Sequence, residues 1–288
     1  MKFTEQALIF NCADCRLLGI ATQPETPAET GVIIVVGGPQ YRAGSHRQFT
    51  LLARRLAEQG IASMRFDYRG MGDSEGDMRN FETVDDDIRA AIDALLKHAP
   101  AVHRVAIWGL CDAASAALYY AHTDTRVGKL VLLNPWVHTE AGASRARLKH
   151  YYLSRLMQRS FWTKLLSGKI EVRKSAGDLS KSAQSAATAT SPTASAPTDP
   201  RHGSAGYIER MRDGLKHFKG EVLFILSGND LVAHEFEEII SRDKLWKKAC
   251  TSPQISQEKL QAANHTFSTR IWRNQVEQWT ARWINKRH

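Results

Sequence analysis

The chain has 288 residues, which suits one large α/β domain or two small ones. Hydrophobic residues make up 43% and charged residues 24%, a balance typical of globular proteins that excludes a fibrous or wholly disordered chain. The formal net charge of +9 admits anionic partners, but no nucleic-acid-binding motif accompanies it, so we expect no nucleic acid to bind.

The sequence shows no signal peptide and no apolar run of about 18 residues, which predicts a cytoplasmic protein without membrane spans. Four Cys residues are too few for a disulfide scaffold. Cys12 and Cys15 form a C-x-x-C pair, but a redox role needs a neighbouring βαβ unit and a zinc site needs two further ligands. We therefore expect these two to flank a hairpin turn near Asp14, within residues 1–22, and we expect no metal or cofactor.

From residue 32 to 134, apolar runs typical of strands buried on both faces alternate with segments of helical spacing. The predicted strands cover 32–36, 61–68, 105–109 and 129–133, and the predicted helices cover 49–59 and 81–97 and begin again at Asp112. A glycine-dense loop, 69–76, lacks the Lys-Ser/Thr ending of a phosphate-binding loop and is interpreted as a structural turn. The alternation predicts an α/β fold with a mostly parallel central sheet flanked by helices.

The alternation then breaks. Residues 143–174 are rich in aromatic side chains and hold nine Lys or Arg against one acid. This fits either a solvated basic face or a lid that meets an acyl ligand or an anionic membrane, which would place the protein at the inner membrane surface. Residues 175–206 are almost entirely Ser, Ala, Thr, Pro and Gly, a composition typical of disorder. We therefore predict a core, 1–139 and 216–288, and a helical lid, 140–215, that carries this low-complexity insertion.

Regular structure resumes after the insertion. The predicted helices there cover 207–218, 233–247 and 268–285, and the predicted strands cover 222–226 and 259–261.

A possible nucleophile lies between the strand that ends at Gly109 and the helix that begins at Asp112. There Cys111 stands among small residues, the layout of a nucleophile elbow. The usual pattern is G-x-S-x-G, and this chain departs from it with Cys for Ser and Ala113 for the second Gly. The alternative interpretation is a buried structural cysteine.

Asp230 and His265 also follow predicted strands, and parallel strands end at the same edge of a sheet. In this order the three side chains would act as nucleophile, orienting acid and general base. The helix N-terminus and a protonated His265 would favour the Cys111 thiolate. The backbone N–H groups of Gly38 and Asp112 would bind the oxyanion.

Each assignment has a plainer alternative. Asp230 would also suit the cap of the helix that follows it, and His265 would suit an ordinary loop position. His46, shortly after the Gly37-Gly38-Pro39 turn, is the rival base. His46 and Trp136 are also our candidates for contacts with the substrate.

Several motifs resemble the proline iminopeptidase and serine aminopeptidase branch of the α/β-hydrolase superfamily: Gly37-Gly38-Pro39, the loop 67–76, Ser227-Gly228-Asn229-Asp230 and Asn264-His265-Thr266-Phe267. Val36 stands where those enzymes usually have His. Residues 36–42, 44–49 and 108–116 are similar to the exosortase A system-associated hydrolases of bacteria that make exopolysaccharide and sort proteins to the envelope. The resemblance implies an α/β-hydrolase fold and hydrolase activity, with the substrate open. A Cys nucleophile on this fold is similar to those of dienelactone hydrolase and polyhydroxyalkanoate synthases, which act on activated esters or thioesters.

We therefore expect a cofactor-independent hydrolase that cleaves an ester or thioester of a small acyl substrate through an acyl-Cys111 intermediate. One alternative is an acyltransferase that uses the same triad on an exopolysaccharide or lipid precursor. Another is a catalytically inactive, hydrolase-like accessory or binding protein. A hydrogen-bonded chain from Cys111 through His265 to Asp230 would count against the inactive protein.

Overall fold

In the computed structural model, residues 2–38, 40–137 and 204–286 are described. Most of the predicted lid lies outside these residues, including the basic segment 143–174 and the insertion as far as 203. Its helices and its disorder therefore stay predictions.

One sheet of eight strands runs through the described residues, in the order β1-β2-β4-β3-β5-β6-β7-β8. The strands are β1 Phe3–Cys12, β2 Cys15–Pro24, β3 Thr30–Val35, β4 Ser63–Phe66, β5 Arg104–Leu110, β6 Val127–Leu133, β7 Glu221–Ser227 and β8 Ile255–Leu260. β1 and β2 form an antiparallel hairpin, and β2 runs antiparallel to β4. Every neighbouring pair from β4 to β8 is parallel. The predicted α/β fold with a mostly parallel sheet is confirmed.

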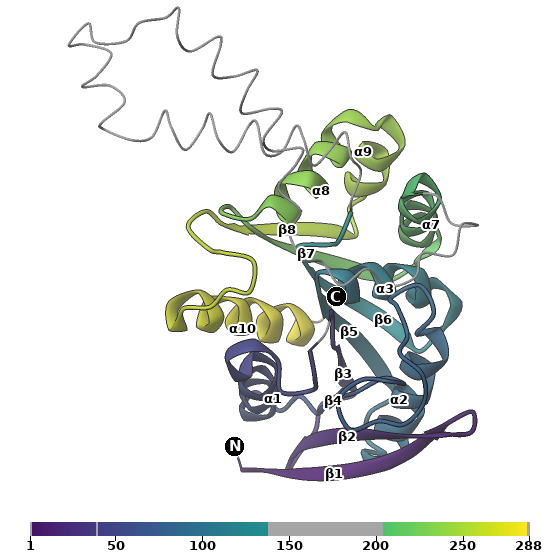
Figure 1. The fold of residues 1–288 in the computed structure, drawn as a ribbon. Coiled ribbons are helices and arrows are strands. Elements are labelled where there is room, and N and C mark those ends of the chain that lie inside the picture. The colour runs from purple at the N-terminus through teal and green to yellow at the C-terminus, as the bar shows by residue number, and fades with distance from the viewer. Residues whose placement is uncertain (1, 39, 138–203, 287–288) are drawn as a thin grey trace, which may run out of the picture. The chain divides into compact units, whose positions relative to one another are not determined.

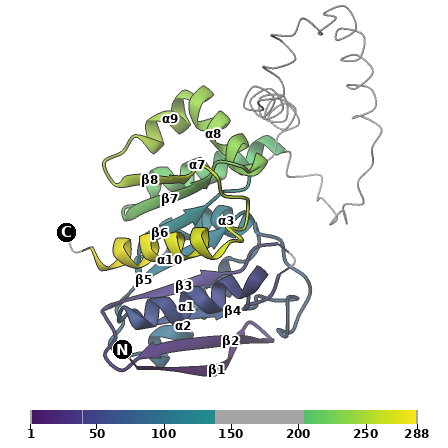
Figure 2. The same ribbon diagram turned by 90° about the vertical axis from the view of Figure 1, so that its left-hand side faces the viewer.

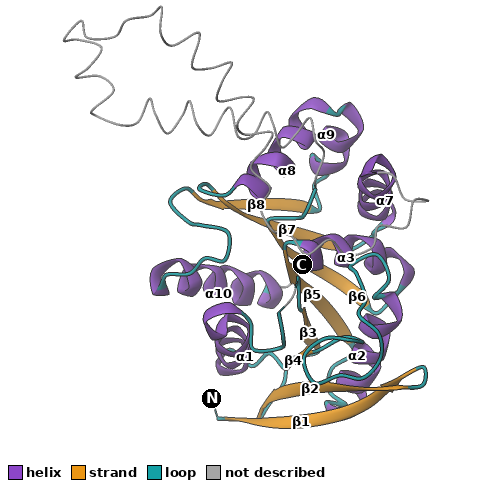
Figure 3. Ribbon diagram, in the orientation of Figure 1, coloured by secondary structure: helices purple, strands orange, loops and turns teal. Residues whose placement is uncertain are grey.

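Helices cover both faces of this sheet, as its apolar strands require. The helices are α1 Gln48–Glu58, α2 Asp85–His98, α3 Asp112–Tyr120, α7 Ser204–His217, α8 Leu231–Arg242, α9 Lys244–Cys250 and α10 Arg270–Asn285, with short 3₁₀ turns η1 Ser45–Arg47 and η2 Ala121–Thr123. α1 and α10 cover one face, and α2, α3 and α7 cover the other (Figure 1 and Figure 2). α8 and α9 lie beyond β7 and β8 (Figure 3), where the Phe236 ring of α8 packs 5.2 Å from Phe224 of β7.

The parallel part of the sheet brings the predicted site residues to one edge. β5 ends at Leu110, β7 ends at Ser227 and β8 ends at Leu260. Because parallel strands share a direction, the loops after their carboxyl ends lie at the same edge. The residues that follow these strands therefore converge although they are far apart in the sequence.

The N-terminal hairpin turns as expected. β1 and β2 pair from Phe3 opposite Pro24 to Cys12 opposite Cys15, and the two-residue turn between them includes Asp14. Both cysteines are free thiols. The C-x-x-C pair therefore flanks a tight turn, and burial raises the pKa of Cys12 to about 11.

The glycine-dense loop after β4 is organised by a buried carboxylate. Asp67 accepts hydrogen bonds from the backbone N–H groups of Arg42 and Asp73 and forms an ion pair with the Arg42 guanidinium. A Cβ on Gly72 would lie 2.3 Å from this carboxylate, so only glycine fits there. The loop is held by the protein's own groups, in agreement with a structural turn.

Two helices predicted from apolar spacing have different bounds in the structure. The predicted helix over 233–247 is two helices, because Asp243 accepts hydrogen bonds from the N–H groups of Leu245 and Trp246 and starts α9. The predicted helix over 81–97 begins only at Asp85.

α7 joins the core. It begins at Ser204, so residues 204–206 of the predicted insertion are helical, and the division of the chain at 216 falls inside the helix. The Tyr119 hydroxyl of α3 donates to the Tyr207 carbonyl (3.0 Å), and the Arg210 guanidinium lies 4.4 Å from the centre of the Tyr119 ring. Residues 204–215 therefore pack with the sheet's helices.

Two glycines of α7 test this packing. A Cβ on Gly214 would lie 2.0 Å from the Leu118 carbonyl oxygen, whereas a Cβ on Gly206 meets nothing within 4 Å. We expect Gly214→Ala to lower the free energy of unfolding by about 1–3 kcal/mol through overpacking. Gly206→Ala, the matched control in the same helix, should raise it by up to about 1 kcal/mol through helix propensity. Chemical denaturation of both variants measures this, and equal effects would contradict the packing of α7 on α3.

Within the described ranges, no helix is both long enough and apolar enough to cross a membrane.

Candidate functional site

A strained turn carries Cys111 from β5 into α3. Its backbone has φ 64° and ψ −124°, a conformation that costs a non-glycine residue about 1–3 kcal/mol. The turn is fixed on both sides, because the Cys111 N–H donates to the Leu133 carbonyl (2.9 Å) and its carbonyl accepts from Trp136 N–H (3.2 Å). A Cβ on Gly109 would lie 2.6 Å from the Ala113 backbone, so the strand and helix approach too closely for a side chain there. This is the geometry of a nucleophile elbow.

An acid–base pair lies at the same sheet edge. His265, in the loop after β8, contacts Asp230, in the loop after β7, through Nδ1 and Oδ2 at 2.8 Å. A carboxylate only accepts hydrogen bonds, so Nδ1 carries the proton and Nε2 is left for proton transfer. Asp230 also accepts from the N–H groups of Val232 and Ala233 and thus caps α8. Asp230 was expected to be either a helix cap or the acid that orients His265, and its contacts fit both interpretations.

One buried amide ties these loops together, and sequence reasoning missed it. Asn134, at the end of β6, is fully buried and has φ 43°. Its Nδ2 donates to the Ser227 hydroxyl (2.8 Å) and to the His265 carbonyl (3.0 Å), and its Oδ1 accepts from the Ser227 N–H (2.9 Å). The only signal in the sequence was a polar residue directly after an apolar strand. Asn134 is thus a positioning residue for the His265 loop.

The thiol does not complete a hydrogen-bonded chain in the free protein. Among the described residues, no hydrogen bond joins Cys111 to His265, although such bonds often tighten only when substrate is present. Burial raises the pKa of Cys111 well above its usual value, and the negative charges of Asp112 and Asp230 raise it further. These effects oppose the thiolate that the helix N-terminus and a protonated His265 were expected to favour.

The predicted oxyanion turn has the right backbone, but one donor is occupied. Gly38 has φ +61° with open space around its Cα, so the left-handed turn is what requires glycine. Its N–H donates to Oδ2 of Asp112 at 2.8 Å. The sequence singled out the backbone N–H of Asp112 and overlooked its side chain, which is half-buried next to Cys111.

The two candidates for substrate contact differ in position. His46 is exposed in η1 with φ 54°, and within the described ranges it has no hydrogen bond to the triad residues. Trp136 is half-buried, and its carbonyl accepts from the Ser115 hydroxyl of α3 (2.9 Å) in addition to its N–H bond to Cys111. Trp136 therefore adjoins the elbow, and the rival base His46 is not engaged there.

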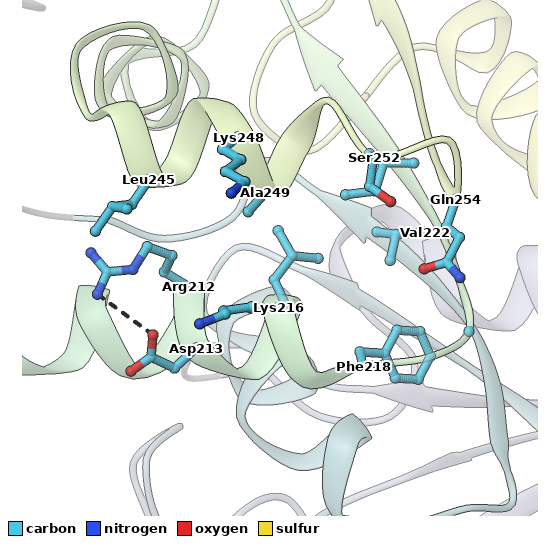
Figure 4. A pocket seen from close by; sticks show the side chains of 13 residues that line it. Arg212, Asp213, Lys216, Phe218, Val222, Leu245, Lys248, Ala249, Ser252 and Gln254 are labelled. Carbon is cyan, nitrogen blue, oxygen red and sulfur yellow. Dashed lines mark hydrogen bonds and ion pairs between the residues drawn. The ribbon is translucent and has the colours of Figure 1, made fainter.

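A cavity of about 350 Å³ opens elsewhere, between α7 and α9 (Figure 4). Val222 and Ile255 line it near the amino-terminal ends of β7 and β8. It therefore lies at the sheet edge opposite the elbow and is not part of this site. In the parts of the chain that are described, no group of three His, Cys, Asp or Glu side chains could hold a metal ion.

Comparisons with known proteins agree with this architecture. A family model described as serine aminopeptidase, S33, matches residues 28–265. Quorum-quenching protein AidA of Acinetobacter baumannii is 31% identical over 134 residues, 44% of this chain and 42% of that protein. Polyketide transferase grgF of a Penicillium species is 30% identical over 98 residues, 33% of each chain. The matches thus span about two fifths and one third of the length of these curated relatives.

A solved structure extends the likeness to the whole fold. The esterase Pf2001 of Pyrococcus furiosus superposes with a TM-score of 0.63 at 15% identity, covering 98% of this chain and 94% of that one. At this identity the likeness concerns the fold. Because the family model covers most of the chain, from before β3 to His265, this protein belongs to the serine aminopeptidase (S33) family of α/β-hydrolases.

Proposed function

We propose that this hydrolase cleaves an ester or thioester of a small acyl substrate through a covalent acyl-Cys111 intermediate. The observation that carries the proposal is the 2.8 Å contact between His265 Nδ1 and Asp230 at the sheet edge that also bears the strained Cys111 turn. A reactive side chain in so costly a backbone conformation supports a role in catalysis.

The reaction follows from these groups. His265 Nε2 takes the thiol proton as the Cys111 sulfur attacks the acyl carbon, and the carbonyl electron pair moves to oxygen. The N–H groups of Gly38 and Asp112 bind that oxyanion. Collapse breaks the ester or thioester bond, and the leaving alkoxide or thiolate takes the proton from His265. Water, deprotonated by His265, then attacks the acyl carbon. The acyl-Cys111 bond breaks, the sulfur takes the proton back from His265, and the acid is released.

Because burial keeps the thiol neutral, His265 acts as a general base during attack and does not stabilise a standing ion pair. Asp230 holds the Nδ1–H tautomer and stabilises the imidazolium that forms. Asn134 fixes the His265 backbone.

Trapping the intermediate tests the proposal. After a rapid acid quench of the enzyme with p-nitrophenyl acetate, we expect intact-mass spectrometry to show one added acetyl group and peptide mapping to place it on Cys111. Cys111→Ala should lack the adduct, and His265→Ala should form it slowly. Cys250→Ala is the matched control, since Cys250 is another half-buried free thiol, and desolvation raises its pKa to about 12. An adduct that survives in Cys111→Ala, or none with any acyl thioester, would leave the inactive accessory protein as the better description.

Acyl transfer is the second candidate, favoured by the partial likeness to a protein named polyketide transferase. It uses the same acyl-Cys111 intermediate, with an alcohol or amine replacing water. The resemblance to exosortase-associated hydrolases extends either proposal to a precursor of exopolysaccharide or of the cell envelope. Product analysis with an added alcohol separates the two: an ester product at the expense of free acid indicates transfer.

A further inference from the structure

The carboxylate of Asp112 lies where an acyl oxygen would be expected. Its Oδ2 accepts the Gly38 N–H at 2.8 Å, and its Oδ1 accepts the Ala113 N–H at 3.0 Å. An oxyanion is bound when it lies about 2.7–3.1 Å from its donors. The Asp112 oxygen therefore already makes the contact with Gly38 that the tetrahedral intermediate needs.

The backbone around this carboxylate is shaped to accept it. A Cβ on Gly37 would lie 2.3 Å from Oδ1 of Asp112 and 2.5 Å from the Leu110 carbonyl oxygen. A side chain at position 37 would therefore displace the carboxylate. Both glycines therefore support the contact between Gly38 and Asp112. Gly37 leaves room for the carboxylate, and Gly38 donates its N–H to Oδ2.

Three titratable groups face Asp112 from the elements around it. Cys111 precedes it on the elbow, Tyr68 approaches from the loop after β4, and His265 approaches from the loop after β8. Burial raises the pKa of Asp112, while the N–H groups of Gly38 and Ala113 and the His265 charge lower it. The Asp112 charge in turn raises the pKa values of Cys111 and Tyr68. One proton on this carboxyl therefore changes the charge seen by both the nucleophile and the base.

We propose that Asp112 is a proton-controlled occupant of the oxyanion hole, which as a carboxylate holds the Gly38 N–H and opposes the Cys111 thiolate, and which yields the site when protonated or displaced by an acyl oxygen. This deepens the proposed function and rests on it for the consequence in turnover. Protonation weakens the hold because a neutral carboxyl accepts a hydrogen bond about half as strongly as a carboxylate does. A neutral Asp112 would also offer its own O–H to the acyl oxygen.

Two variants separate the charge from the occupancy. Asp112→Asn keeps an oxygen that can accept the Gly38 N–H but removes the charge, whereas Asp112→Ala removes both. Asp86→Ala is the control for a helix-first-turn carboxylate, since Asp86 is exposed in the first turn of α2.

The first readout needs no substrate. In ¹⁵N–¹H spectra recorded against pH, the Gly38 amide of the wild type should shift in one acidic transition, which both Asp112 variants lose and Asp86→Ala keeps. Iodoacetamide should alkylate Cys111 at least about tenfold faster at neutral pH in both Asp112 variants, because a fall of one pKa unit raises the thiolate fraction tenfold. A Gly38 transition that persists in Asp112→Asn, or alkylation rates equal to the wild type, would overturn the proposal.

Turnover gives the second readout. With an acyl thioester, Asp112→Ala should exceed Asp112→Asn, because only alanine frees the Gly38 donor. The reverse order would overturn the role of occupancy. If no form of the protein turns over any acyl probe while the amide and alkylation results hold, the proposed function fails and the control of the thiol by Asp112 stands.

Discussion

Asp230→Asn is expected to lower kcat for an acyl thioester by about 10³–10⁴-fold while leaving the melting temperature close to that of the wild type. The kinetic loss follows because the amide N–H of asparagine would donate to Nδ1 and hold the imidazole in the wrong tautomer, with its proton on Nε2. The neutral amide would also fail to stabilise the imidazolium, as in the Asp-to-Asn change of a serine protease triad. The stability is kept because Asn is as good a helix cap as Asp. Steady-state kinetics and thermal denaturation of the same preparation measure the two effects.

The design separates the two roles of Asp230. Asp230→Ala removes the cap of α8 as well and should cost a further 1 kcal/mol or so in stability. Asp243→Asn is the matched control, because Asp243 caps α9 in the same way and has no His265 contact. Equal kinetic losses in Asp243→Asn and Asp230→Asn would contradict a catalytic role for Asp230 and leave it a cap.

The sequence predicted the triad positions by a topological argument. Cys111, Asp230 and His265 are separated by 119 and 35 residues, yet each comes after a predicted strand. Strands that alternate with helices pair in parallel, and the loops that follow parallel strands lie at one edge of the sheet. This argument was enough to predict that Asp230 and His265 lie close together, because the end of each strand determines where the following loop begins.

The order of strands does not predict how the side chains at this edge are oriented. Whether Asp112 turns its carboxylate to Gly38 depends on a turn 74 residues earlier in the chain and on the space that Gly37 leaves. The cross-link from Asn134 to the His265 carbonyl likewise joins residues 131 positions apart. Neither contact leaves a periodic pattern in the sequence. The thiolate was therefore predicted from the helix N-terminus and a protonated His265, and the opposing charge of Asp112 was missed.

The broken helix at Asp243 is a different kind of miss. Apolar spacing continued across 233–247, and a one-residue break hardly disturbs a helical period. The signal was local, an Asp that can bond the N–H groups two and three residues later. Weighing caps within a periodic segment would have found it.

The ion pair between Arg69 and Asp87 is buried, and we expect its disruption to give the largest loss of stability. Asp87 in the first turn of α2 is fully buried and receives the Arg69 guanidinium at 2.7 Å and the Arg69 N–H at 2.8 Å. Arg69 is itself 7% exposed. As a sequence pattern, the three successive acids at the start of α2, Asp85, Asp86 and Asp87, fit only the positive end of a helix. The pair also fastens the glycine-dense loop to α2.

Asp87→Ala should therefore lower the free energy of unfolding by about 3–5 kcal/mol, because it strands a buried guanidinium without its counter-charge. At about 2–4 °C per kcal/mol for a chain of this size, the melting temperature should fall by about 10 °C. The double variant Arg69→Met, Asp87→Leu should recover most of that loss, since apolar side chains of similar volume often replace a buried pair at no cost. A single variant that melts like the wild type would contradict the burial of this pair, and a double variant as unstable as the single would mean that the loop depends on the Asp87 hydrogen bonds and not on the stranded charge.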